Sequence, residues 1–153
     1  MDTFRNGVTL HHIGYVVASI RQSAEGFARS LGMQWDGRII HDPRQTVYVS
    51  FLYAAGDETK PVIELVEPEG PQSVVARFLE RGGGLHHLCY EVDDLSKQLE
   101  WTRANRDLIA QPPVPAVAFG GRRIAWVFTR SRLLIEYLER RVPGPEESGA
   151  TSW

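Results

Sequence analysis

The alternation of apolar and polar residues predicts strands and one clear helix in the first half of the chain. Residues 12–17 are β-branched or alternate in polarity, which indicates a strand. After Ser19, apolar side chains recur every three or four positions, so we expect a helix that Ser19 caps and Gly32 ends. The apolar stripe of this helix consists of Ile20, Ala24, Phe27, Ala28 and Leu31. A β-α-β-β-β order is completed by strands predicted at 34–40, 46–53 and 61–66.

The same order of elements is predicted for the second half. A strand over 85–92 leads through Asp93 and Asp94, which are good cap residues, into a helix over 95–105. The last three strands are predicted near Val117, at 123–129 and at 133–139. Between the halves, Pro71 favours the start of a linker helix over 71–82, and three glycines end it.

Two segments of the sequence repeat, which indicates that the halves arose by duplication. His11-His12-Ile13-Gly14-Tyr15 recurs 75 positions later as His86-His87-Leu88-Cys89-Tyr90. A glutamate inside an apolar strand also recurs, as Glu64 and Glu136, 72 positions apart. We therefore predict an α+β fold in a single domain, 1–153, with module one at about 9–66 and module two at about 84–140. Residues 142–153 are rich in Pro, Gly and Ser and are predicted to form a loose tail.

Composition narrows the classes of partner. The chain has 153 residues, 42% of them hydrophobic and 24% charged, with a formal charge of −2. This balance argues against nucleic acid or a membrane as a partner recognised by bulk charge. No apolar run approaches the roughly 18 residues of a membrane span, and the first residues lack the apolar stretch of a signal peptide. A single cysteine, Cys89, excludes an intramolecular disulfide and favours a cytoplasmic location.

The repeated histidines and glutamates are the candidate chemistry. Glu64 and Glu136 alternate with apolar residues, and a carboxylate on an apolar face loses several kcal/mol of hydration unless it is paired or binds a cation. If the two sheets curve around one cavity, two imidazoles and two carboxylates converge there. The predicted metal ligands are therefore His12, Glu64, His87 and Glu136. Imidazole favours Zn, Ni, Co or Fe, whereas carboxylate tolerates Mn or Mg.

The remaining histidines and the cysteine have simpler interpretations. By strand alternation, His11 and His86 are expected on the outer face. His41, beside Asp42 and Pro43, is expected to be a solvated turn residue. Cys89 faces the cavity by alternation, but without a nucleophile spacing it is expected to be a small core residue.

These residues resemble the vicinal oxygen chelate superfamily, which includes glyoxalases, methylmalonyl-CoA epimerases, extradiol dioxygenases and antibiotic-resistance proteins. The resemblance covers about 9–140 and is strongest toward the epimerases, in the segments 12–14, 63–68, 75–79, 83–94 and 120–124. It implies that the two modules form a curved mixed sheet, or cup, with a divalent metal (Co, Zn, Ni, Mn or Mg) at the four predicted ligands. It also implies a homodimer, an acyl-CoA or other thioester substrate, and metal-assisted removal of an α-proton with Glu136 as base. Arg122 and Arg123 would then meet coenzyme A phosphates.

Two positions depart from the epimerase pattern, and other functions stay open. Val49 stands where family members with a second catalytic glutamate carry it, and Glu64 stands where some epimerases have glutamine. The His-Glu-His-Glu set equally resembles glyoxalase I, a lactoylglutathione lyase. A metal-free protein that sequesters a drug in the cup is a further alternative, although it predicts apolar residues at the four positions. An extradiol dioxygenase is disfavoured, because such an enzyme would use two histidines and only one carboxylate.

Overall fold

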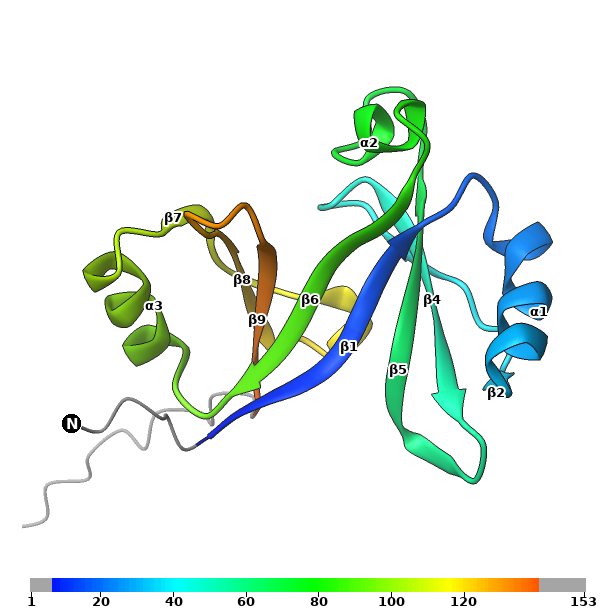
Figure 1. Ribbon diagram of the computed structural model, residues 1–153, viewed down its shortest axis with the longest axis horizontal. Helices are drawn as coiled ribbons and strands as arrows, with labels where there is room; N and C mark the ends of the chain where they lie inside the picture. Colours follow the sequence, from blue (N-terminus) through cyan, green and yellow to red (C-terminus); the bar gives the residue numbers. More distant parts are fainter. Residues whose placement is uncertain (1–6, 141–153) are drawn as a thin grey trace, which may run out of the picture.

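The computed structural model describes residues 7–140, and the predicted tail at 142–153 lies outside them. In this part of the chain, nine strands form one open mixed sheet with the order β2-β4-β5-β1-β6-β9-β8-β7, and β3 pairs with β4. The sheet bends at the central β1–β6 pair, so that its two halves stand as the walls of a cup (Figure 1). The predicted α+β class and curved mixed sheet are confirmed.

The first half follows the sequence pattern closely. Its elements are β1 (Val8–Val16), α1 (Ile20–Leu31), β2 (Met33–Trp35), β3 (Ile40–Asp42), β4 (Val47–Ala54) and β5 (Asp57–Pro68). The hydroxyl of Ser19 accepts a hydrogen bond from the Gln22 backbone N–H at 3.3 Å, and Gly32 follows the helix with φ 64°. The predicted strand at 34–40 is wrong in detail, because two short strands flank that segment instead.

The second half departs from the prediction at the strand that follows its helix and at the linker. Its elements are α2 (Ala76–Glu80), β6 (Gly84–Val92), α3 (Leu95–Ala104), β7 (Leu108–Pro115), a single 3₁₀ turn (Val117–Phe119), β8 (Arg123–Phe128) and β9 (Leu134–Glu139). The strand predicted near Val117 therefore ends before that residue. The predicted linker helix shrinks to five residues, because the segment after Pro71 forms turns.

The two halves are built alike around the central strands. β1 pairs with β5 in parallel, β6 pairs with β9 in parallel, and β1 and β6 are antiparallel to each other. The outer face of each half packs against its own helix, through Leu52 and Leu65 under α1 and through Ala125 and Val127 under α3. Side chains alternate across a strand, so the neighbours of these core residues point into the cup. Glu64, the neighbour of Leu65, therefore lies inside the cup.

No helix in the described part of the chain combines the length and apolar character that crossing a bilayer requires.

Candidate metal centre and active site

The four predicted ligands converge at the floor of the cup. His12 lies on β1, Glu64 on β5, His87 on β6 and Glu136 on β9, and their ligand atoms all lie within 4.8 Å of one another. Glu64 Oε2 is 3.0 Å from His12 Nε2 and 3.1 Å from His87 Nε2. Glu136 Oε1 is 3.6 Å from His12 Nε2. All four side chains are buried.

Burial and mutual charge perturb the ionisation of this cluster. Burial alone would raise the pKa of Glu64, but the imidazoles of His12 and His87 hold it well below its usual value. Burial and the charge of Glu64 instead raise the pKa of Glu136. Burial would lower the pKa of His12, yet the two carboxylates raise it above its usual value. The two glutamates are thus chemically distinct, because the pKa of Glu64 is lowered and that of Glu136 is raised.

The cluster fits a divalent cation. Glu136 Oε1 is buried and has no hydrogen-bond partner, which is costly for a carboxylate unless a cation or proton meets it. Both histidines direct Nε2 at the same carboxylate oxygen, so a single ion could contact all four groups. Two imidazoles and two carboxylates suit a borderline metal such as Zn, Co or Ni and tolerate Mn.

His11 and His86 do not point outward, and that prediction is wrong. The pairing of β1 with β6 shifts register between Leu10 and His12 and again between Gly14 and Tyr15, so His11 and His86 are the extra residues of two β-bulges. A bulge breaks the alternation of side chains at the residue it inserts. His11 is consequently buried, and His86 lines the cavity.

Each bulge histidine is hydrogen-bonded to the predicted ligand histidine that follows it. Nδ1 of His11 lies 2.8 Å from Nδ1 of His12, and Nδ1 of His86 lies 2.9 Å from Nδ1 of His87. A histidine that ligates a metal through Nε2 carries no proton there, so with metal bound the Nδ1–H of His12 and of His87 would donate to the bulge histidine. Burial and the neighbouring imidazole lower the pKa of His11 and of His86 to about 4, which keeps both neutral acceptors. The repeated His-His doublet was the sequence signal for this arrangement.

Gly14 makes room for the ring of His87, one of the predicted ligands, and its substitution should disturb the site. A Cβ at Gly14 would overlap the ring of His87, its cross-strand neighbour. Gly14→Ala is therefore expected to lower the free energy of unfolding by about 1–3 kcal/mol and to weaken metal binding. Gly26→Ala is the matched control, since nothing lies near that position in α1 and alanine should stabilise the helix by about 1 kcal/mol. Thermal unfolding and metal titration measure both, and unchanged metal affinity in Gly14→Ala would contradict the expectation.

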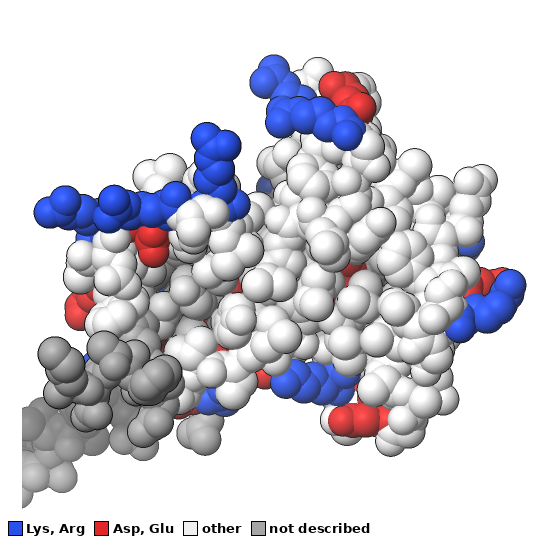
Figure 2. Space-filling model, viewed as in Figure 1, with Lys and Arg blue, Asp and Glu red and all other residues white. Residues whose placement is uncertain are grey.

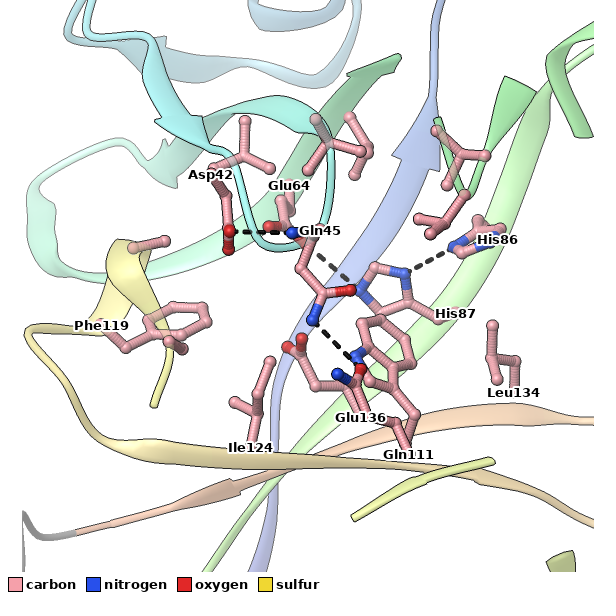
Figure 3. Close-up of a pocket in the computed structure, with 18 of the residues that line it drawn as sticks. Asp42, Gln45, Glu64, His86, His87, Gln111, Phe119, Ile124, Leu134 and Glu136 are labelled. Atoms are coloured by element: carbon pink, nitrogen blue, oxygen red, sulfur yellow. Dashed lines mark hydrogen bonds and ion pairs between the residues drawn. The ribbon is translucent and has the colours of Figure 1, made fainter. Parts of the chain in front are cut away.

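A cavity of about 260 Å³ opens beside the four predicted ligands. Glu64, His87 and Glu136 line it together with apolar side chains of both halves (Figure 3). Val49 is buried in its wall, so the position aligned with a second catalytic glutamate does face the cavity but carries no acid. Asp42, on the neighbouring strand β3, is a further buried carboxylate of the wall.

Comparison with known proteins gives the family. The family model of the glyoxalase/bleomycin resistance protein/dioxygenase superfamily matches residues 11–126. The chain belongs to this superfamily. The resemblance to the vicinal oxygen chelate proteins is thereby confirmed, and the paired-module cup with its buried His and Glu cluster is the architecture expected of a member.

Several relatives within the superfamily are named as epimerases. The chain is 34% identical over 88 residues to an ethylmalonyl-CoA/methylmalonyl-CoA epimerase of Cereibacter sphaeroides, a match that covers 56% of the chain and 62% of that relative. It is 26% identical over 137 residues to the mitochondrial methylmalonyl-CoA epimerase of Dictyostelium discoideum, covering 86% of the chain and 78% of the relative. The crystal structure of methylmalonyl-CoA epimerase from Mycobacterium tuberculosis superimposes with a TM-score of 0.73 at 26% identity, covering 89% of this chain and 88% of that one.

The other residues singled out from the sequence lie outside the cavity of this superfamily member. Arg122 pairs with Glu91 at 3.2 Å, and Arg123 holds Glu139 through two hydrogen bonds of 2.7 and 2.9 Å. Neither arginine lines the cavity, so their contact with substrate stays a prediction. Cys89 is a buried core residue, as expected, and burial raises the pKa of its thiol.

His41 is half-exposed, as expected, although it lies in β3 rather than in a turn. Its Nε2 is 3.1 Å from Glu69 Oε1, and its ring stacks on Tyr48. It takes no part in the site.

Four polar residues of the cavity wall were missed by sequence reasoning: Asp42, Gln45, Gln111 and Trp126. Gln45 precedes β4, Gln111 lies in β7 and Trp126 lies in β8. The alternation of β8 would have placed Trp126 on the same face as Ile124, but β7 was predicted too late in the chain to reveal Gln111. Their proximity depends on strand pairing, which no local pattern encodes.

Proposed function

We propose that the protein is a divalent-metal-dependent epimerase of an acyl thioester, resembling methylmalonyl-CoA epimerase. The observation that carries this proposal is the convergence of His12, Glu64, His87 and Glu136 beside a cavity in a superfamily whose named relatives here are acyl-CoA epimerases. The family likeness supports an isomerase, and the residues of the site support removal of an α-proton.

Glu136 is the proposed base. Its carboxylate lines the cavity, and its Oε1 has no hydrogen-bond partner, so it is free to accept a proton from a bound substrate. Burial and Glu64 raise its pKa, which brings it closer to that of a useful base at neutral pH. Glu64, held ionised by two histidines, keeps their Nε2 atoms aimed at one point. A divalent metal there would stabilise the negative charge of the enolate as it develops.

Inversion also needs a proton on the opposite face of the α-carbon, and Asp42 is the proposed donor. Glu64 is committed to the two histidines, which leaves Asp42 as the other carboxylate among the described wall residues. In the β3–β4 ladder Asp42 pairs with Val47, whose side chain faces the cavity, as does that of Val49. Asp42 comes from module one and Glu136 from module two, so the two carboxylates approach the cavity from different walls (Figure 3).

The surface near the cavity suits a ligand with phosphates. Figure 2 shows Lys and Arg gathered at α2 and at the corner near β7, with mostly uncharged surface between them. Arg77 and Arg81, exposed at α2, follow Val74 and Val75 of the cavity wall. On the other side, the exposed Arg132 precedes the wall residue Leu134. An acyl-CoA could therefore place its acyl group in the cavity and its phosphates near one of these groups.

Deuterium exchange tests the proposal. The metal-loaded protein is incubated with methylmalonyl-CoA in deuterium oxide, and mass spectrometry and chiral analysis follow exchange and inversion separately. We expect both in the wild type, whereas Asp42→Asn should keep exchange and lose inversion. Asparagine retains the Oδ1 that accepts the backbone N–H groups of Arg44 and Gln45, so the turn is preserved.

The same assay separates the alternatives. Turnover of the methylglyoxal–glutathione hemithioacetal without exchange of any acyl-CoA would assign a glyoxalase I activity, which the glutamate at position 64 favours. Absence of metal after mild purification, together with absence of both reactions, would favour a ligand-binding protein of the same fold. The homodimer and the cytoplasmic location stay predictions.

A further inference from the structure

Three cavity residues lie side by side on neighbouring strands. Gln111 in β7 pairs with Trp126 in β8, and Trp126 pairs with Glu136 in β9. Directly opposed residues share one face of a sheet with Cβ atoms about 5 Å apart. All three line the cavity, so Trp126 stands next to the proposed base.

The indole N–H of Trp126 is a buried donor without an acceptor. Its Nε1 has no hydrogen-bond partner in the structure, and an indole can only donate. A buried donor left unpaired is costly, so such a group in a cavity wall indicates that a ligand completes it. By contrast, the indole of Trp35 donates to the Ser50 hydroxyl at 2.7 Å.

The ring of Trp126 is held in place beside the metal ligands. It packs edge-on against His87 with ring centroids 4.8 Å apart and also meets His86 at 6.3 Å. The histidine pair therefore fixes the position of the Trp126 side chain that carries the N–H.

Two uncharged amides lie next to this donor. Gln45 Nε2 donates to Gln111 Oε1 at 3.1 Å, which links the segment before β4 to β7 across the cavity (Figure 3). Because both residues line the cavity, the amide pair borders the space in front of Trp126 and Glu136. This part of the wall offers hydrogen bonds without adding charge.

We propose that Trp126 and the Gln45–Gln111 pair form a subsite for a carboxylate oxygen of the substrate's acyl group, with the Trp126 N–H as its principal donor. The inference rests on the proposed function and adds to it which residues would hold the carboxylate of the acyl group. Two glutamates at the metal site offset a divalent charge, which leaves less attraction for a second substrate anion. Neutral donors on β7 and β8 supply the missing recognition and hold the α-carbon beside Glu136.

A matched pair of ligands and a matched pair of variants test the subsite. Methylmalonyl-CoA carries the carboxylate, and propionyl-CoA has a hydrogen in its place. Trp126→Phe keeps the ring and removes the donor. We expect this variant to bind methylmalonyl-CoA about 10- to 100-fold more weakly, the usual value of a hydrogen bond to a charged group. Its affinity for propionyl-CoA should stay within about twofold of the wild type, as measured by calorimetry on metal-loaded protein.

Trp35→Phe is the control, because it removes a donor already bonded to Ser50 and away from the cavity lining. It should leave both affinities unchanged.

An NMR experiment observes the donor directly. In ¹⁵N-labelled wild-type protein, the indole N–H signal of Trp126 is the one that disappears in Trp126→Phe. This signal should shift with methylmalonyl-CoA and stay in place with propionyl-CoA.

The outcomes separate the subsite from the function. Equal weakening of both ligands in Trp126→Phe, or no weakening of either, would overturn the subsite while the epimerase proposal stands. If the wild type binds neither CoA ester, the proposed function is wrong and the subsite falls with it.

Discussion

Glu136→Gln is expected to lower the rate of α-deuterium exchange into methylmalonyl-CoA by about 10²- to 10⁴-fold, the usual contribution of a general base. Glutamine has nearly the same shape and keeps an oxygen for a metal, but it cannot accept a proton from the substrate. The Oε1 of Glu136 has no hydrogen-bond partner, so the substitution breaks no hydrogen bond at that atom. Exchange by mass spectrometry and metal content by elemental analysis should be measured on the same preparation.

Glu139→Gln is the matched control on the same strand. Glu139 is also buried, but its carboxylate binds Arg123 and does not line the cavity. This variant should lose some stability and keep its exchange rate. Exchange that survives in Glu136→Gln with metal bound would remove Glu136 from the role of base.

His12→Ala is expected to weaken metal binding by at least about a hundredfold. Loss of a residue that merely orients a ligand costs about 10- to 100-fold in metal affinity, and His12 is placed to be a ligand itself. Its Nε2 lies 3.0 Å from Glu64 and 3.6 Å from Glu136, so its removal also leaves two buried carboxylates with one histidine fewer. Competition with a chromogenic chelator measures the affinity.

The pH dependence of metal binding follows from the same residue. A protonated His12 cannot bind a metal, and the carboxylates raise its pKa above the usual value despite its burial. Affinity in the wild type should therefore fall as pH decreases through that raised pKa and level off above it. His12→Ala should lose much of this dependence. His41→Ala, which removes a half-exposed histidine paired with Glu69, should bind metal like the wild type. Equal affinity in His12→Ala and the wild type would exclude His12 as a ligand.

The site residues were largely predictable because the chain carries them twice. A glutamate alternating with apolar residues signals a buried carboxylate in any strand, and the repeat linked Glu64 and Glu136 to His12 and His87. The structure brings these four side chains together, although ligation itself stays a prediction. The first helix was equally predictable, since Ser19 and Gly32 mark its ends within the local sequence.

The failures at the site have one physical origin. Strand alternation assumes regular pairing, but two β-bulges between β1 and β6 turn His11 and His86 inward. The bulges depend on how two strands 75 positions apart fit together, which no local pattern contains. The row of Gln111, Trp126 and Glu136 likewise depends on register between separate strands.

The sequence by itself determined the duplicated α+β architecture, the two helices under the sheet and the identity of the four convergent side chains, because periodicity and repetition are local properties. Only the tertiary structure decided that each predicted ligand histidine contacts the histidine before it, that Arg122 and Arg123 pair with carboxylates, and that an unpaired indole N–H lies beside the proposed base. Those features depend on strand register and packing across the cup, where residues distant in sequence acquire their partners.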